Sequence, residues 1–241
     1  IINFTIDSTT TTPATATLPE GYAFLSNQID SKAYNFVVLN DTTVTKSNTQ
    51  FFFENLQIFE GQLITYSFIY DQGSNPKQVF TLPDTNIDTT TIKVVVNPSS
   101  SNTATATYTK VTDVLDISST SEVFFLQEER DGNFQIYFGN DVVGKALPDG
   151  AIVSVTYLVT AGTEANKANN FVATATVVDS LNNGLSDFTI TPVSAASGGA
   201  DRESVDNIKF SAAARFSTQN RLVTFKDYET YILNNYPNID S

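Results

Sequence analysis

The octapeptide Leu63-Ile64-Thr65-Tyr66-Ser67-Phe68-Ile69-Tyr70 gives the clearest evidence of the fold class. Within it, Thr65 and Ser67 alternate with four larger residues, Ile64, Tyr66, Phe68 and Tyr70. Successive side chains of a β-strand point to opposite faces, so this period of two predicts a strand with one buried face. A turn at Glu60-Gly61 precedes the strand, and Gly73-Ser74-Asn75-Pro76 breaks the chain after it.

Similar short segments lie on both sides of this octapeptide. Strands are expected at residues 22–25, 34–39, 50–53, 56–59, 79–82, 91–96, 104–110, 123–127, 133–138, 152–159, 171–178 and 189–193. Tight turns are expected to flank residues 142–147, and a hairpin pair to close with residues 152–159. Residues 7–17, which are rich in Ser and Thr, are expected to be extended or mobile. A spacing of roughly eight to twelve residues is typical of a small antiparallel sandwich or barrel.

The fold expected from this pattern is mainly β, with antiparallel sandwich or barrel-like subdomains and a short α-helical pair at the C-terminal end. Residues 1–75 are expected to form the N-terminal part of a first β domain. Residues 76–160 are expected to form an inserted antiparallel β subdomain, and residues 161–197 to return strands to the first domain. Residues 198–241 are expected to form the helical pair.

The hydrophobic period changes at Gly198-Gly199, where an alanine-rich segment begins. Val205, Ile208 and Ala212 follow one another at the i, i+3, i+7 spacing of one helix face. A helix is therefore expected over about residues 201–216, with Asp201 as its N-cap.

A second helix is expected to open at Thr224, because Asp227 lies three residues later in a pattern close to a capping box. Tyr228, Tyr231, Ile232 and Asn235 would share one face of this helix, and Pro237 would end it. The helical pair would then present an alanine-rich face and a tyrosine-rich face.

Composition excludes several kinds of chemistry. The 241 residues include no Cys, His, Met or Trp. A Ser-His-Asp triad, a Cys-His pair, an HExxH zinc site and a disulfide are therefore impossible within this chain. We expect no enzyme activity, no cofactor and no metal.

The formal net charge of −13 and the sequence pI of about 4.2 oppose binding to a phosphate backbone or to an anionic membrane surface. No apolar run approaches the roughly 20 residues that span a bilayer. Neither nucleic acid nor membrane is therefore expected as a partner.

Several motifs occur in an order that resembles a known family. The C-terminal motifs are Gly198-Gly199-Ala200-Asp201-Arg202-Glu203-Ser204 and Val223-Thr224-Phe225-Lys226-Asp227-Tyr228. Earlier matches are Leu18-Pro19-Glu20-Gly21-Tyr22-Ala23-Phe24, Tyr137-Phe138-Gly139-Asn140-Asp141, and Val155–Thr160 with Gly162 and Asn166. Together they resemble the J-like baseplate wedge proteins of contractile-tailed phages, in particular the large wedge subunit of the T4-type branch.

The resemblance implies a structural role: wedge subunits join through helical and C-terminal regions into a ring around the tail tube. The implied partners are other baseplate wedge proteins and copies of the full-length protein. The implied location is the virion tail baseplate, after synthesis in the host cytoplasm. Because the chain lacks an initiator Met and stops after an amphipathic helix, it is expected to be an internal fragment.

The expected assembly interface follows from the same resemblance and lies in the C-terminal segment. Its candidate residues are Gly198, Gly199, Asp201, Arg202, Glu203, Arg215, Arg221, Asp227, Tyr228 and Tyr231. Phosphate binding at the double glycine is disfavoured, because Asp201 and Glu203 would repel an anion. A sharp turn that needs the wide range of φ available to glycine explains the two glycines better. Arg215 and Arg221 are explained equally well by solvated helix ends and by an interface.

Three alternatives stay open at lower weight. Glu128, Glu129 and Asp131 could suggest a glycosidase, but adjacent strand residues point to opposite faces. The segment from Asp179 is similar to a calcium loop, but Leu181 stands where an oxygen ligand is required. Aromatic residues such as Phe51, Phe52 and Phe53 would suit a host-receptor or carbohydrate-binding adhesin, although a buried core is the default for them.

Overall fold

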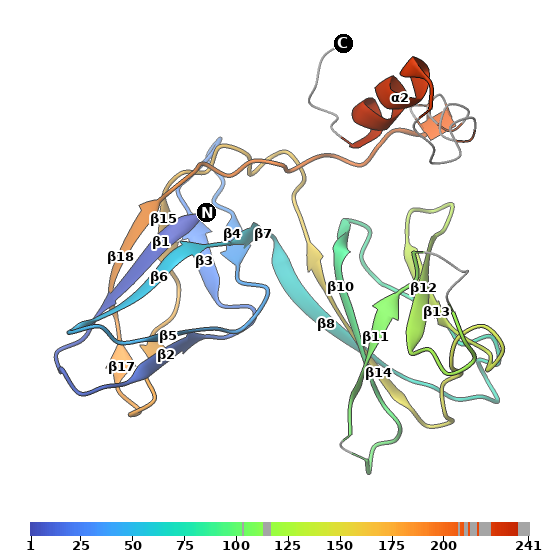
Figure 1. The fold of residues 1–241 in the computed structure, drawn as a ribbon, viewed down its shortest axis with the longest axis horizontal. Coiled ribbons are helices and arrows are strands. Elements are labelled where there is room, and N and C mark those ends of the chain that lie inside the picture. Colours follow the sequence, from blue (N-terminus) through green and yellow to red (C-terminus); the bar gives the residue numbers. More distant parts are fainter. Residues whose placement is uncertain are drawn as a thin grey trace. The chain divides into compact units, whose positions relative to one another are not determined.

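The computed structural model describes residues 1–102, 104–112, 117–206, 208–209, 212, 216 and 223–235. It divides the chain into two compact units, Ile1–Gly199 and Ala200–Ser241. The first unit consists of strands and connecting loops, which confirms the mainly β prediction (Figure 1). None of the described helices has the length and apolar character needed to cross a membrane.

The strands of the first unit are short, as the spacing of turn residues predicts. They are β1 (Ile2–Asp7), β2 (Thr15–Leu18), β3 (Ala23–Ser26), β4 (Asn35–Val37), β5 (Thr42–Thr45), β6 (Gln50–Leu56), β7 (Phe59–Glu60), β8 (Gln62–Ile69), β9 (Val79–Thr81), β10 (Ile87–Asn97), β11 (Ala106–Lys110), β12 (Val123–Glu128), β13 (Phe134–Phe138), β14 (Ile152–Val159), β15 (Phe171–Ala173), β16 (Val177–Val178), β17 (Gly184–Leu185) and β18 (Asp187–Pro192). They build two hydrophobic cores.

The first core is built around β1, which is the central strand of the sheet β18-β1-β6. Ile2, Phe4 and Ile6 of β1 are fully buried. The ring of Phe4 lies 5.3 Å from that of Phe24 and 5.8 Å from that of Phe53. β6, the smaller sheets with the orders β15-β3-β4-β7, β2-β5 and β16-β17, and several loop residues complete this core.

Two expectations for the N-terminal region were wrong. No strand was expected before residue 22, yet β1 is the central strand of its sheet, and β2 begins within residues 7–17, the segment that was expected to be extended or mobile. Alternation of Ile2, Phe4 and Ile6 with polar residues is a strand signal that could have identified β1. β2 forms because Ala16 and Leu18 are buried while Thr17 bonds to Thr43 across the β2–β5 pair.

The second core lies within a seven-stranded sheet of order β8-β14-β10-β11-β12-β13-β9. Neighbouring strands are antiparallel except for β11 and β12, which are parallel. The sheet curls until the ring of Phe68 on β8 lies 5.0 Å from that of Phe80 on β9. These two strands are the ends of the sheet, so it forms a nearly closed barrel.

The strand predicted for the octapeptide is present as β8, but its own side chains are half-buried or exposed, so the predicted buried face is only partial. Ile64 and Phe68 pack against the second core, and Tyr70, just past the strand, is buried. Tyr66 shares this face but is 43% exposed, because β8 has a neighbour on one side only among the described strands.

The expected hairpin strand near residues 142–147 is absent from the described structure, which has no strand there. The side chain of Asn140 accepts hydrogen bonds from the amides of Val142 and Val143, and Asp141 accepts one from Ala146. Because these amides already donate to nearby side chains, they are not available for hydrogen bonds to a neighbouring strand.

The predicted C-terminal helical pair is not supported. The structure describes one helix of the pair, α2 (Phe225–Asn235). For the other, Asp201 to Ser204 are not helical, and helical conformation begins at Val205. Ser204, a favoured N-cap residue, therefore stands in the position expected for Asp201. Much of the predicted first helix, and Pro237, lie outside the described residues.

Candidate assembly interface

The double glycine ends the first unit in a conformation that other residues would not adopt easily. Gly198 has φ of +89°, in the left-handed region. Gly199 has a spatial requirement instead, because a Cβ atom there would lie 2.3 Å from the carbonyl oxygen of Gly162. The predicted turn therefore depends on the positive φ of Gly198, whereas Gly199 is required by close packing against the backbone of Gly162.

A loop at residues 161–168 holds this turn in place within the first unit. The side-chain oxygen of Asn166 accepts a hydrogen bond from the Gly199 amide at 3.1 Å, and its nitrogen donates to the Gly199 carbonyl at 2.8 Å. The amide of Ala196 donates to the Ala168 carbonyl, and the amide of Lys167 donates to the Ala196 carbonyl, both at 2.7 Å. Sequence reasoning included Asn166 in the family motif but missed this role, since the pairing spans 33 positions.

Polar contacts in turn fix the loop to the strands of the first core. Glu164 forms an ion pair with Lys32 at 2.6 Å and accepts a hydrogen bond from the Tyr34 hydroxyl at 3.1 Å. Glu60 accepts a hydrogen bond from the Ala161 amide, and burial raises the pKa of the Glu60 carboxyl. These contacts therefore hold the C-terminal end of the first unit against the strands of its first core.

The charged candidates beyond the double glycine lie in the second unit. Asp201, Arg202 and Glu203 are exposed and lie outside any helix. Arg215 and Arg221 lie outside the described residues. The interface predicted for these five charged residues therefore stays a prediction.

The start of α2 has the capping geometry that the sequence predicts. The Asp227 carboxylate accepts hydrogen bonds from the amides of Thr224, at 2.8 Å, and Val223, at 3.2 Å. The Asp227 amide donates to the Thr224 hydroxyl at 3.3 Å. Asp227 is thus fixed at the helix N-terminus, where its negative charge also suits the helix dipole.

The second unit exposes many large apolar side chains among its described residues. Phe216 and Phe225 are 82% and 87% exposed, and the others are Val205, Ile208, Val223, Tyr228, Tyr231 and Ile232. Tyr228, Tyr231 and Ile232 follow the i, i+3, i+4 spacing, so they lie on one face of α2. Apolar and aromatic side chains gathered outside a core are typical of protein–protein contacts.

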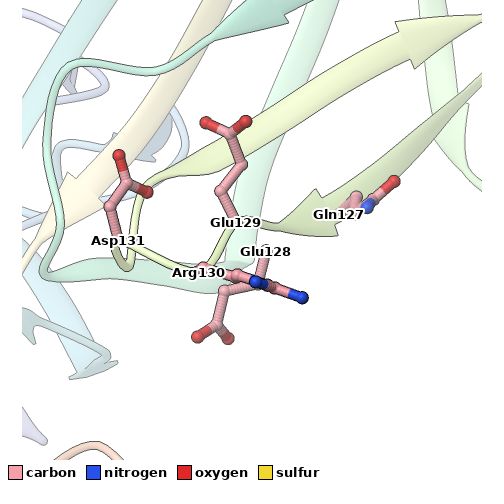
Figure 2. Close-up of a pocket in the computed structure, with 5 residues that line it drawn as sticks. All are labelled: Gln127, Glu128, Glu129, Arg130 and Asp131. Carbon is pink, nitrogen blue, oxygen red and sulfur yellow. The ribbon is translucent and has the colours of Figure 1, made fainter.

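The acidic residues considered for hydrolysis lie at the turn between β12 and β13. Gln127 to Asp131 line a shallow depression there, and the carboxylates of Glu128 and Glu129 point in opposite directions (Figure 2). They do not face a common substrate position, which a glycosidase pair requires. The geometry supports the interpretation as surface charge.

The aromatic run in β6 is mostly core, as the default interpretation predicts. Phe51 and Phe53 are buried, and Phe52 is 46% exposed on the opposite face. One partly exposed ring does not form an aromatic platform for a sugar.

The carboxylate of Asp179 stabilises its own loop. It accepts hydrogen bonds from the amides of Leu181 and Asn183, each at 2.9 Å, and from the Asn183 side chain. These bonds lower the pKa of Asp179, with the Asn183 side chain as the main cause. Its oxygens satisfy the turn, which explains why a polar residue occupies a position that is 4% exposed.

This arrangement predicts a pH dependence of stability. A lowered folded-state pKa adds stability above the unfolded-state value, and that contribution is lost as pH falls through the folded-state value. Asp179→Ala should lower the free energy of unfolding by about 2 kcal/mol at neutral pH, because two amides lose their acceptor. Urea unfolding should show the difference from wild type shrinking as the pH falls from neutral to below the ordinary pKa of Asp, about 3.9. A difference that stays constant over this range would contradict the assignment.

Two sequence comparisons support the relation to baseplate wedge proteins. Residues 62–166 match the family described as bacteriophage baseplate wedge protein gp6, third domain. This segment begins at the first residue of β8 and includes β14 and Asn166 of the loop at the double glycine. Its bounds therefore enclose all seven strands of the barrel-like sheet.

The chain is also similar to baseplate wedge protein gp6 of Enterobacteria phage T4. The two sequences are 26% identical over 245 residues, which cover 92% of this chain. The chain spans about a third of the length of that relative, since the alignment covers 35% of it.

Proposed function

We propose that this chain is a structural section of a phage baseplate wedge, located in the virion tail and acting by protein–protein assembly around the tail tube. The alignment with T4 gp6 over 92% of the chain is the observation that carries the proposal. Within this proposal, the chain is an internal section of a gp6-like subunit of the J-like group, and no catalysis or cofactor is required.

The two units have different roles in this proposal. The first unit has two packed cores and works as a rigid spacer. The second unit supplies contacts, which is supported by its exposed aromatic side chains. The proposed partners are other baseplate wedge proteins and copies of the full-length protein; nucleic acid and membrane have no part in it.

The proposed contact surface combines the predicted residues with the exposed apolar ones. Tyr228 and Tyr231 are each 50% exposed on α2 and serve as its aromatic anchors. The other candidate contact residues are Gly198, Gly199, Asp201, Arg202, Glu203, Arg215, Arg221 and Asp227, of which Asp227 caps α2.

The test is co-purification of the full-length protein with the other wedge proteins of its phage. We expect the double variant Tyr228→Ala/Tyr231→Ala to weaken the complex at least about tenfold, because interface tyrosines each contribute roughly 1 kcal/mol or more. Glu203→Lys should have a smaller effect that depends on salt, as is usual for exposed charges.

Phe52→Ala is the matched control, since it removes an exposed aromatic ring from the first unit. It should leave the complex intact. Equal retention of all variants would argue against assembly through the second unit, and failure of the wild-type protein to join any tail protein would remove the proposal.

A further inference from the structure

The turn between β16 and β17 runs into the only Asn-Gly pair among the 241 residues, Asn183-Gly184. Both residues are exposed. Gly184 has no side chain to shield its backbone nitrogen. Apart from its chain neighbours, no atom of the described residues lies within 4 Å of the position that a Cβ atom of residue 184 would take. This nitrogen can therefore approach the side chain of Asn183 with little steric hindrance.

The side chain of Asn183 is held by Asp179, at the start of the same turn. Its nitrogen donates to both carboxylate oxygens, at 3.1 Å and 3.0 Å. The backbone amide of Asn183 donates to the same carboxylate at 2.9 Å, and the Asp179 amide donates to the Asn183 carbonyl at 3.0 Å. The Asn183 side chain must break its two bonds to the carboxylate before it can turn toward the nitrogen of Gly184.

We propose that Asn183 is a site of spontaneous deamidation, and that Asp179 restrains the reaction. The Gly184 backbone nitrogen, after losing its proton to hydroxide, forms a bond to Cγ of Asn183. The bond from Cγ to Nδ2 breaks, and Nδ2 takes a proton from water and leaves as ammonia. Water then opens the cyclic imide at either of its carbonyl carbons, which gives aspartate or isoaspartate. The step needs only water and hydroxide.

The product would disturb the turn, because a carboxylate would replace the amide that donates to Asp179. Asp179 would lose two hydrogen bonds and gain a negative neighbour, while its own side chain is 4% exposed. The turn is also joined to β2. The Ser180 amide donates to the Thr15 carbonyl at 2.8 Å, and the Thr15 amide donates to the Ser180 hydroxyl at 3.0 Å. Deamidation should therefore loosen this turn and its attachment to β2.

The test follows deamidation at each asparagine by mass spectrometry of the digested chain, after incubation at mildly alkaline pH. Asn183 should react at least about tenfold faster in Asp179→Ala than in the wild type, because hydrogen bonds to a charged acceptor are worth such a factor. Asp179→Asn, which keeps the size of the side chain but not its charge, should give an intermediate rate. Asn182 is the internal control and should lag behind Asn183 in Asp179→Ala.

Two further variants separate the chemistry from a general loosening of the fold. Gly184→Ala, added to Asp179→Ala, should slow the reaction at least about tenfold, because the new methyl group hinders the attacking nitrogen. The space around residue 184 accepts this methyl group. Ser180→Ala removes one bond to Thr15 but none between Asp179 and Asn183, so its rate should stay close to that of the wild type.

Asn183→Asp reproduces one product and supplies a second readout. It should raise the equilibrium constant for unfolding at least about tenfold, as measured in urea at neutral pH. Circular dichroism should show that each variant is folded before incubation. The proposal is overturned if Asn183 reacts equally fast in the wild type and in Asp179→Ala, or if Gly184→Ala leaves the rate unchanged. These measurements need no wedge protein, so they can fail while the proposed wedge function holds.

Discussion

Phe4→Ala is expected to lower the free energy of unfolding by about 4 kcal/mol, the largest loss for a single core residue of the first unit. Phe4 is fully buried on the central strand β1. Its ring lies within 6.4 Å of the rings of four neighbours, Tyr22, Phe24, Phe53 and Phe188. Alanine would lose the transfer free energy of the ring and leave a cavity among neighbours that are held in sheets.

Guanidinium unfolding followed by circular dichroism measures this loss. Phe52→Ala is the matched control, because Phe52 lies on the adjacent β6 with its side chain partly exposed. The control should lose less than about 1 kcal/mol. Similar losses for the two variants would show that β1 does not hold the first core together.

Gly61→Ala is expected to lower the free energy of unfolding about as much as Phe4→Ala, but by a different mechanism. Gly61 connects β7 to β8 with φ of +134°, which L-residues rarely adopt. A Cβ atom there would lie 2.6 Å from the Val159 carbonyl oxygen and 2.8 Å from the Leu158 side chain. Backbone strain and overpacking each contribute about 1–3 kcal/mol, so a loss of about 4 kcal/mol should follow.

Gly150→Ala separates these two contributions. Gly150 also has positive φ, +79°, but no other atom lies within 4 Å of the added Cβ position. Its loss should stay near 1–2 kcal/mol, the usual cost of left-handed backbone for an L-residue. If Gly61→Ala lowered the free energy of unfolding no more than Gly150→Ala, the close approach of Gly61 to Leu158 and Val159 of β14 would be refuted.

Local patterns predicted individual strands well, because burial follows a period of two. The existence of the strand β8 and the burial of Phe51 and Phe53 in β6 were predictable for this reason. β1 carries the same signal but was overlooked in a short N-terminal segment. The predicted strand over residues 171–178 is instead two short strands, β15 and β16, which pair with β3 and β17 in different sheets.

Strand partners could not be predicted from such patterns. The parallel pairing of β11 with β12 and the approach of β8 to β9 depend on contacts between distant segments. The division of the β region into a first domain and an inserted subdomain stays a prediction.

Only part of the candidate interface could be predicted. The helix cap formed by Thr224 and Asp227 was predicted correctly, because it depends on residues only three positions apart. The support of Gly199 by Asn166 was missed because it joins segments far apart in the chain. The first predicted helix began too early, since Ser204 competes with Asp201 for the capping position.

Hydrogen–deuterium exchange of the full-length protein, free and bound to its neighbouring wedge proteins, tests the proposed role of the second unit most directly. Assembly through this unit should slow exchange in Phe225–Asn235, while the amides of the buried strand β1 should exchange at the same slow rate in both states. Unchanged exchange throughout residues 200–235 in a complex that forms and protects only the first unit would contradict the proposal.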